Sequence, residues 1–342
     1  MHKYLLCTIG LLAACGNDNT TASSDPLTGC KTYYNAFRTA VGACPGGVEA
    51  QAGFSDDVVT ALCTSLAAKV TAGSIHYDGS QLAPCISAAQ SIGCVLRNPV
   101  EPAACRMLFT GTVAAGGPCD LTPECASGGT CQLSHDGMGN AICPGVCVAR
   151  AAAGAPCTTA SDCQSGLTCP GTVCADQPVA VGGTCASSGD CASSAYCSFA
   201  GGTGPGMCQP LIADGQPCLG NEKYQCMPGS GCTGGSPSVC TPLVADGGMC
   251  TGDTSCKSQA CIKNVCQTLT TVGLGQPCGV ITGGIAFCNQ GFCQMTGTGH
   301  SGTCTAYIAV GGACSPSQVG ACTPESSCSV TTNTCVASCG GF

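Results

Sequence analysis

Cysteine is the residue type in this sequence with the greatest capacity for chemistry, because 38 of the 342 residues are Cys. Cysteines ligate metals, act as nucleophiles or form disulfides. Zinc and thiolate-cluster sites draw on closely spaced cysteines, but the chain contains no C-x-x-C, C-x-C or C-C pair. No histidines occur in an H-x-x-x-H pattern either. We therefore expect no metal site and no cofactor.

Other catalytic arrangements are also weakly represented. Near His300, residues 299–302 read GHSG, which is similar to a hydrolase elbow, but Thr303 replaces its closing glycine. A Cys–His nucleophile would need a free thiol near His76, His135 or His300. There is no phosphate-binding loop and no dinucleotide fingerprint. The sequence assigns no catalytic residue, and we expect a protein that is not an enzyme.

Three acidic residues share one position, directly before the second cysteine of a repeated unit: Glu124, Asp162 and Asp190. Later units do not keep an acid there; they carry Gln225, Ser255, Phe287 and Ala321. We interpret these carboxylates as turn formers or solvating groups rather than as a repeated catalytic site.

The N-terminus indicates export. Residues 1–3 form a cationic start, residues 4–12 form an apolar run too short to span a bilayer, and Leu12-Ala13-Ala14-Cys15 is similar to a bacterial lipobox. We predict a signal peptide over residues 1–15, lipid attachment to Cys15 and a polar tether over residues 16–27. An ordinary secretory signal is the alternative. Gly16, in place of Asp, favours the outer membrane or cell surface by resemblance to bacterial lipoprotein sorting.

Export determines how the remaining cysteines are interpreted. Without Cys7 and Cys15, the chain keeps 36 cysteines, an even number that allows 18 disulfides in an oxidising compartment. Aromatic residues make up 4% of the chain and Trp is absent, so hydrophobic cores must be small. The sequence predicts a small disulfide-rich fold.

Residues 28–108 predict a short α-helical domain stapled by six cysteines. Apolar residues recur every three to four positions from Cys30 to Cys44. A second helix is expected from the cap Ser55 to the stop signal Gly73, and a third from residues 78–80 to Gly93. The six cysteines of this domain are Cys30, Cys44, Cys63, Cys85, Cys94 and Cys105.

Residues 116–342 predict a tandem array of seven knot-like repeats with little regular secondary structure beyond short β-hairpins. Gly-x-x-Cys opens each unit, near residues 116, 154, 182, 215, 247, 275 and 311. Each unit has four framework cysteines: Cys119, Cys125, Cys131 and Cys147; Cys157, Cys163, Cys169 and Cys174; Cys185, Cys191, Cys197 and Cys208; Cys218, Cys226, Cys232 and Cys240; Cys250, Cys256, Cys261 and Cys266; Cys278, Cys288, Cys293 and Cys304; Cys314, Cys322, Cys328 and Cys335.

Spacing separates constant from variable parts of the array. The fourth cysteine of a unit lies 10 to 12 positions before the next first cysteine, whereas the last gap inside a unit varies from 4 to 15 residues. This pattern indicates rigid joints, with a positive φ expected at each opening glycine, and variable presented loops. Four cysteines allow three connectivities. We favour pairing first with third and second with fourth, which would interlock two turns. Cys143 and Cys339 lie outside the framework. They pair with each other if the array folds back, or pair locally; a free reactive pair is the alternative that an oxidising compartment disfavours.

The segments GTVAAGGPC, CPGVC and AGAPCTTASDCQSGLTC resemble cysteine-rich repeats of the Dickkopf N-terminal type. Such repeats occur in tandem in bacterial lipoproteins, particularly myxobacterial ones, and the segment with Tyr77-Asp78 and Cys85 also matches that group. The resemblance covers most of the mature chain but consists mainly of Gly and Cys. It implies an extracellular binding or scaffold role and no catalytic residues. Cysteines of animal Dickkopf domains are missing, so it does not imply Wnt-type receptor binding.

Charge excludes several partners. From residue 116 onward, four Lys and Arg residues face 11 Asp and Glu, a net charge of −7. Nucleic acid and anionic lipid surfaces would be repelled. We expect a lipid-anchored protein that binds an extracellular protein or glycan; the alternatives are an array of protease-inhibitor modules and a structural envelope spacer. Candidate contact residues are aromatic side chains expected to be exposed: Tyr196, Phe199, Tyr224, Phe287, Phe292 and Tyr307.

Overall fold

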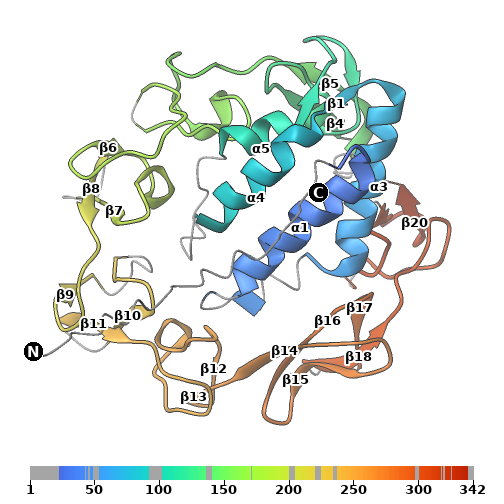
Figure 1. Cartoon of the computed structure of the whole chain (residues 1–342). Coiled ribbons are helices and arrows are strands. Elements are labelled where there is room, and N and C mark those ends of the chain that lie inside the picture. Colours follow the sequence, from blue (N-terminus) through green and yellow to red (C-terminus); the bar gives the residue numbers. More distant parts are fainter. Residues whose placement is uncertain are drawn as a thin grey trace, which may run out of the picture.

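The computed structural model describes residues 23–42, 44, 47–48, 54–91, 102–135, 141–170, 172–199, 205–219, 225–233, 237–296, 300–316, 318, 320–324 and 326–337. Within these ranges, no helix is both long enough and apolar enough to cross a membrane. The predicted fold class is confirmed: a helical N-terminal domain precedes a series of small units stapled by disulfides. A ring of units surrounds the helices in Figure 1.

The helical domain contains three helices in the predicted regions, but the first begins at Pro26, inside the segment 16–27 that was predicted as a tether. Gly93, the predicted end of the third helix, lies outside the described residues. Two further features were not predicted. Helix α3 is capped by Ser55, whose side chain accepts a hydrogen bond from the Val58 amide, and it ends at Gly73 in the left-handed conformation (φ 79°). The additional features are helix α5 and a short antiparallel pair, β1 with β2. The elements are α1 (Pro26–Gly42), α3 (Asp56–Ala72), β1 (Ile75–Tyr77), the 3₁₀ helix η1 (Gly79–Gln81), α4 (Leu82–Ser91), α5 (Ala103–Leu108) and β2 (Phe109–Gly111).

Two small clusters form the core of this domain. Val59, Leu62 and Leu66 of α3 pack around the Cys30–Cys63 disulfide and Ile75. Leu82 and Leu108 pack around Cys85–Cys105. Each cluster is therefore centred on a covalent link, as the low content of large apolar residues requires.

Among the described residues, every unit except unit 2 carries short strands, which form antiparallel pairs in most units, and unit 2 has isolated bridges instead. Units 1, 3 and 4 each have a three-stranded sheet, and unit 6 has five strands because β14 pairs in parallel with β16. In unit 1 the elements are β3 (Pro118–Cys119), η2 (Thr122–Glu124), β4 (Thr130–His135) and β5 (Ala141–Val148); in unit 2, η3 (Ala160–Asp162); in unit 3, β6 (Thr184–Cys185), η4 (Ser188–Asp190), β7 (Ala195–Ser198) and β8 (Gly206–Pro210).

The remaining elements are short strands and one 3₁₀ helix. In unit 4 they are β9 (Pro217–Cys218), β10 (Ser230–Thr233) and β11 (Ser238–Pro242); in unit 5, η5 (Asp253–Ser255), β12 (Cys261–Ile262) and β13 (Val265–Cys266); in unit 6, β14 (Thr268–Val272), β15 (Pro277–Ile281), β16 (Gly284–Cys288), β17 (Phe292–Met295) and β18 (Ser301–Thr305); in unit 7, β19 (Ser326–Cys328) and β20 (Cys335–Ala337).

The predicted positive φ at the opening glycines is confirmed at all seven, with values between 77° and 88°. In unit 3, the amide of Gly183 donates to Ala180 O, which closes a turn with Gly182 at its third position. The Gly182 amide itself donates to Cys208 O, the fourth cysteine of the same unit. The glycine therefore lies inside its unit.

One backbone pairing recurs six residues before each first cysteine. The residue at that position pairs in parallel with the second cysteine of the unit, as Val179 does with Cys191. The same pairing recurs at Val113, Ala151, Ile212, Val244, Val272 and Ile308. Most of the constant spacing between units is thus part of the next unit, and the true linkers are only a few residues long.

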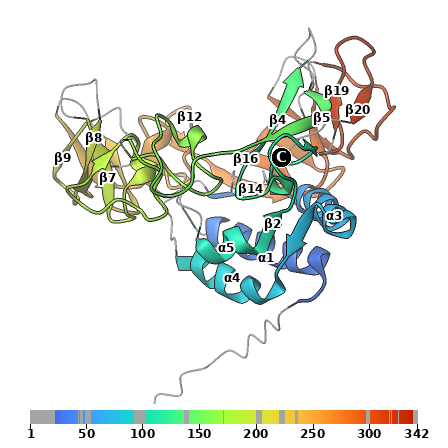
Figure 2. The same ribbon diagram turned by 90° about the horizontal axis from the view of Figure 1, so that it is seen from above.

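The ring of units lies against one side of the helical domain (Figure 2). Unit 1 joins the core of that domain through Leu121. At the far end of the chain, the Gly291 amide of unit 6 donates to Asp57 Oδ2 at 2.9 Å. Helix α3 therefore contacts unit 1 and unit 6, and unit 7 lies beside unit 1 in Figure 2.

Candidate functional site

The disulfides of the seven units have the crossed arrangement favoured from the sequence. In each unit the first cysteine pairs with the third and the second with the fourth. The pairs are Cys119–Cys131 and Cys125–Cys147, Cys157–Cys169 and Cys163–Cys174, Cys185–Cys197 and Cys191–Cys208, Cys218–Cys232 and Cys226–Cys240, Cys250–Cys261 and Cys256–Cys266, Cys278–Cys293 and Cys288–Cys304, and Cys314–Cys328 and Cys322–Cys335.

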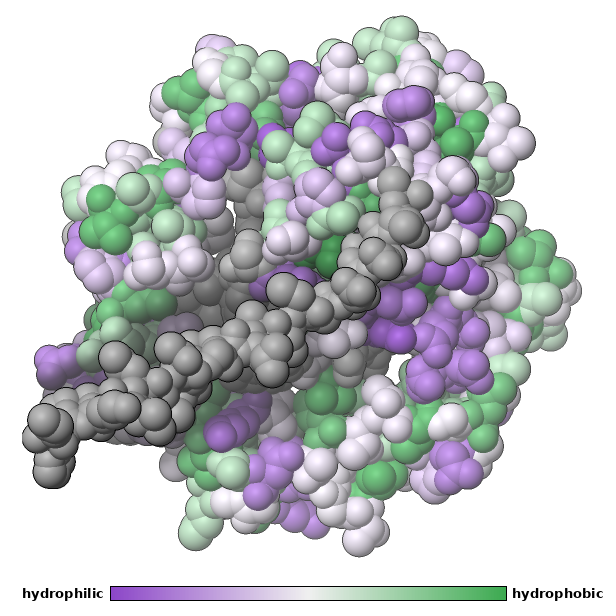
Figure 3. All heavy atoms as spheres, viewed as in Figure 1, coloured by the Kyte–Doolittle hydropathy of each residue, from purple (hydrophilic) through white to green (hydrophobic). Residues whose placement is uncertain are grey.

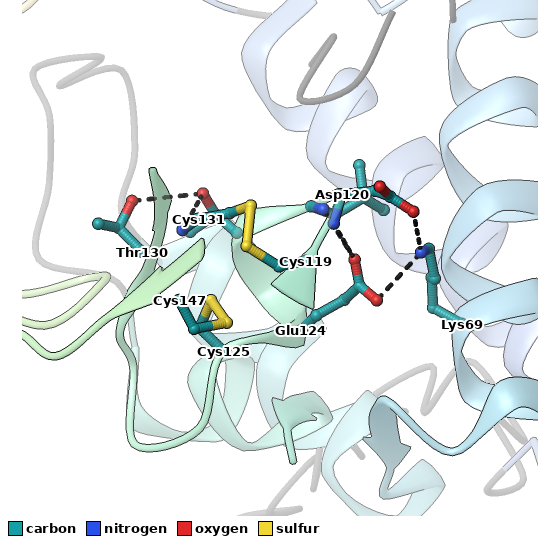
Figure 4. Close-up of a disulfide and its surroundings, with 10 residues drawn as sticks. Lys69, Cys119, Asp120, Glu124, Cys125, Thr130, Cys131 and Cys147 are labelled. Carbon is teal, nitrogen blue, oxygen red and sulfur yellow. Dashed lines mark hydrogen bonds and ion pairs between the residues drawn. A yellow bond between two sulfur atoms is a disulfide. The ribbon is translucent and has the colours of Figure 1, made fainter. Parts of the chain in front are cut away.

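The crossed disulfides bring the sulfur atoms of a unit close together. In unit 1, for example, the sulfurs of Cys119, Cys125 and Cys147 form one group (Figure 4). These groups are oxidised: each cysteine among the described residues is disulfide-bonded, Cys44 and Cys143 included. A disulfide sulfur is not the thiolate that a metal or a nucleophilic mechanism uses. Cys15, Cys94 and Cys339 lie outside the described residues.

The acidic position before the second cysteine forms turns, as interpreted from the sequence. Glu124 Oε2 accepts the amides of Asp120 and Leu121 at 2.7 and 2.8 Å. Asp162 and Asp190 accept two amides in the same way, and Gln225 Oε1 accepts the Leu219 amide at 2.9 Å. Since an amide oxygen does the same in unit 4, the turn in units 1 to 4 uses a hydrogen-bond acceptor rather than an acid or base, and units 6 and 7 have Phe287 and Ala321 at this position instead.

Glu124 makes an additional contact, with a lysine of the helical domain. Its Oε1 lies 3.0 Å from Lys69 Nζ on α3, and Asp120 Oδ2 lies 2.6 Å from the same nitrogen (Figure 4). Burial raises the pKa of Glu124, but the two amide hydrogen bonds, Ser74 and Lys69 outweigh it, so the pKa lies below its usual value. Burial lowers the pKa of Lys69, but the two carboxylates outweigh it and raise the pKa. This ion cluster joins unit 1 to the helical domain.

The three histidines of the described residues are separate and exposed. His76 lies in β1, His135 ends β4 and His300 precedes β18. The backbone carbonyl of His300 accepts the Val280 amide at 2.7 Å. Gly299, the first residue of the GHSG segment, lies outside the described residues.

The candidate aromatic contacts are less exposed than expected. Phe292 is buried (8% exposed) because it stacks on Tyr307, with ring centroids 6.5 Å apart. Tyr307 is half-buried against the helical domain, and this burial, opposed by its hydrogen bond with Ser55, raises its pKa. Tyr196 and Phe287 are half-buried, Phe199 is exposed, and Tyr224 lies outside the described residues. The expected exposure is thus wrong for Phe292, which contributes to packing.

A different set of apolar residues is exposed at recurring positions. In every unit, the residue before the first cysteine pairs with the residue before the fourth, across two antiparallel strands or an isolated bridge. We call these the outer pairs: Pro118 with Val146, Pro156 with Val173, Thr184 with Met207, Pro217 with Val239, Met249 with Val265, Pro277 with Thr303, and Ala313 with Thr334.

Several outer-pair side chains are strongly exposed. Met249 is 82% exposed, Met207 50% and Val146 47%. Hydrophobic residues are interspersed with polar ones over the visible face of the ring (Figure 3). Val or Met precedes the fourth cysteine in units 1 to 5, and this regularity was present in the sequence but not recognised.

Among the pockets between the helical domain and the array, two have walls that include unit 1. A pocket of about 400 Å³ lies against units 1 and 2, and Arg106 and Asp176 are among its lining residues. A second pocket, of about 660 Å³, lies where α1 and α3 meet unit 1 and unit 7. Neither pocket has a signal in the sequence, because its walls come from segments that are distant along the chain.

Comparison with known proteins does not assign the chain to a family: no family model, curated protein or solved structure matches it. The repeated, disulfide-paired units are therefore shown by the structure alone. A disulfide-rich array of this kind is consistent with an extracellular, non-catalytic protein in an oxidising compartment.

Proposed function

We propose that this protein is an exported, non-enzymatic binding scaffold that presents its seven units to an extracellular protein partner. In this proposal a lipid on Cys15 holds the chain at the outer membrane or cell surface. The resemblance to Dickkopf-type repeats of bacterial lipoproteins agrees with such a role. The observation that carries the proposal is the recurrence of exposed apolar side chains at the outer pairs of units 1 to 5.

Isolated apolar residues are common on protein surfaces and need no explanation. The outer pairs differ because the same two backbone positions are used in unit after unit, and their strands are held by disulfides. Since the crossed disulfides fix these strands, little conformational entropy is lost when a partner binds. Several identical positions along one array also allow a partner to bind at more than one unit.

A protein partner is favoured over a glycan by the side chains available. Sugar rings stack on exposed aromatic faces, and among the described candidate aromatics only Phe199 is classed as exposed. Val, Met and Pro at the outer pairs suit an apolar protein surface. The acidity of the array suits a partner that is neutral or basic.

The test measures binding of the purified, oxidised chain to intact cells of the producing strain. The test variant is Val173→Ser, Met207→Ser, Met249→Ser and Val265→Ser combined. The control variant is Val181→Ser, Leu274→Ser and Val310→Ser, which removes apolar side chains that are equally exposed but lie outside the outer pairs. We expect at least tenfold weaker binding for the test variant, wild-type binding for the control, and loss of binding after protease treatment of the cells.

Two results would contradict the proposal. Equal binding by the test variant and the control would show that the outer pairs take no part. Binding that survives protease but is lost after periodate oxidation of the cells would identify a glycan partner instead.

A further inference from the structure

The second pocket lies at the point where the ring of units closes. Its volume is about 660 Å³, and its walls come from three parts of the chain. Tyr34, Phe54 and Leu62 belong to the helical domain, Leu121 belongs to unit 1, and Tyr307 and Pro324 belong to the end of the array. The size is within the range of small-molecule sites, and such sites occur preferentially between structural units.

The described lining residues carry no charge: apart from aliphatic and aromatic side chains and glycine, they contribute a disulfide-bonded cysteine and the hydroxyls of Thr, Ser and Tyr. The rings of Tyr34 and Phe54 are stacked, with centroids 5.9 Å apart and an interplanar angle of 27°. A flat apolar ring would find further aromatic surface here. A charged ligand would lose its hydration without gaining an opposite charge.

We propose that this pocket binds an uncharged small molecule with an aromatic ring. Apolar walls hold water poorly, so a ligand that fills the space gains by removing apolar surface from water. The few hydroxyls on the walls orient a ligand that carries one polar group. This inference does not rest on the outer pairs and is independent of the proposed partner.

Binding here is coupled to closure of the ring. A ligand touches α3 on one side and the end of the array on the other, and it binds only when both are in place. By linkage, a ligand that binds only the closed form stabilises that form. Occupancy should therefore raise the thermal stability of the contact between α3 and the last units.

The experiment uses N-phenyl-1-naphthylamine, a neutral aromatic probe that fluoresces in apolar surroundings, titrated into the purified, oxidised chain. Val58→Phe and Thr323→Phe each introduce a larger side chain at the pocket wall, the first from α3 and the second from unit 7. Val310→Phe adds the same side chain at a position that is 59% exposed and outside the pocket. Far-ultraviolet circular dichroism and the absence of free thiols identify variants that have folded.

We expect saturable binding of one probe per chain, a Kd at least tenfold higher for Val58→Phe or Thr323→Phe, and an unchanged Kd for Val310→Phe. If one of the two filling variants fails to fold, the Kd of the other still tests whether the probe binds in this pocket. The inference is overturned if the probe does not bind saturably, or if the folded filling variants bind it as well as Val310→Phe does.

Discussion

Glu124 shows how one residue position takes on different tasks in different units. In units 2 and 3, Asp162 and Asp190 accept two backbone amides each. Asp162 is exposed, whereas Glu124 is buried (3% exposed) and also contacts Lys69. The shared role stabilises the turn before the second cysteine. The additional contact joins unit 1 to α3, because the charge of Glu124 pairs with Lys69.

We expect Glu124→Gln to lower the free energy of unfolding of the junction between unit 1 and α3 by about 1–2 kcal/mol at neutral pH. The amide oxygen keeps the turn but cannot pair with Lys69 through a charge. Hydrogen exchange of the amides near Lys69 and Leu121 measures the change. Asp162→Asn is the matched control, because Asp162 forms the same turn without a lysine contact, and we expect a smaller effect there.

The effect should depend on pH with a defined sign. Because the pKa of Glu124 is lowered in the folded state, its contribution is present above the unfolded pKa and is lost as the pH falls through the folded value. The pKa of Lys69 is raised, so the contribution of Lys69 is lost as the pH rises through its folded value. The difference between wild type and Glu124→Gln should therefore shrink in acid. A constant difference from neutral pH to strong acid would contradict this account.

The opening glycines permit a second prediction at the residue scale. Gly182 has φ +88°, and a Cβ there would meet nothing within 4 Å, so only the backbone conformation opposes a side chain. Gly182→Ala should cost about 1–2 kcal/mol, the penalty of a left-handed L-residue. At Gly273 a Cβ also meets nothing, and no positive φ is required, so Gly273→Ala is the matched control. We expect faster hydrogen exchange in unit 3 of Gly182→Ala and little change around residue 273 of Gly273→Ala. Similar exchange rates in the two variants would show that the positive φ of Gly182 does not determine the stability of the unit.

At the scale of the element, each unit is held together mainly by covalent bonds. The buried cluster of unit 3 consists of its four cysteines and Ala195, with Val179 packed against it. Such a cluster buries too little apolar surface to fold alone. The crossed pairing closes two overlapping loops, so each disulfide restricts the loop that the other closes.

Removing one of the two crossed disulfides should open a unit without unfolding the array. Cys163→Ser with Cys174→Ser removes a link between residues 11 positions apart in unit 2. The expected cost is about 3 kcal/mol, or on the order of a 100-fold increase in local opening. Hydrogen exchange measures this opening, with unit 5 of the same sample as the internal reference. Unchanged protection of unit 2 would show that packing, not the disulfide, holds the unit.

The elements differ in how well the sequence predicts them. Helix α3 was predicted at both ends, because Ser55 and Gly73 are local signals read within one turn of the helix. The crossed pairing was favoured from the regular spacing of the cysteines. Strands β1 and β2 were missed because each has three residues and they pair across more than 30 positions. The outer pairs were not predicted because their recurring residue is Val or Met, and single exposed apolar residues are common on protein surfaces.

At the scale of the whole molecule, the array bends around the helical domain. Helix α3 contacts unit 1 through Lys69 and unit 6 through Asp57. No local pattern predicts this closure, because the hydrogen bond from Gly291 to Asp57 joins residues 234 positions apart. The hint of closure in the sequence is that Cys143 and Cys339 would pair with each other only if the array folded back. Cys143 is disulfide-bonded in the structure.

Closure predicts a compact particle in solution. Small-angle scattering of the oxidised chain should give a radius of gyration near that of a compact chain of this length, about 20 Å. The radius exceeds this value moderately if the ring has an open centre. A much larger radius, with the distance distribution of an elongated particle, would show that the seven units extend as a straight array and that the contacts of Asp57 and Tyr307 do not form.

The central claim is that an exported chain is held by crossed disulfides in every unit. The most direct test is mass spectrometry of the membrane-extracted protein, alkylated before and after reduction, followed by mapping of the linked peptides. We predict a lipid mass on Cys15, no alkylation before reduction, 36 alkylated cysteines afterwards, and peptides that link Cys157 to Cys169 and Cys163 to Cys174. Alkylation before reduction, or a link from Cys157 to Cys163, would contradict the account.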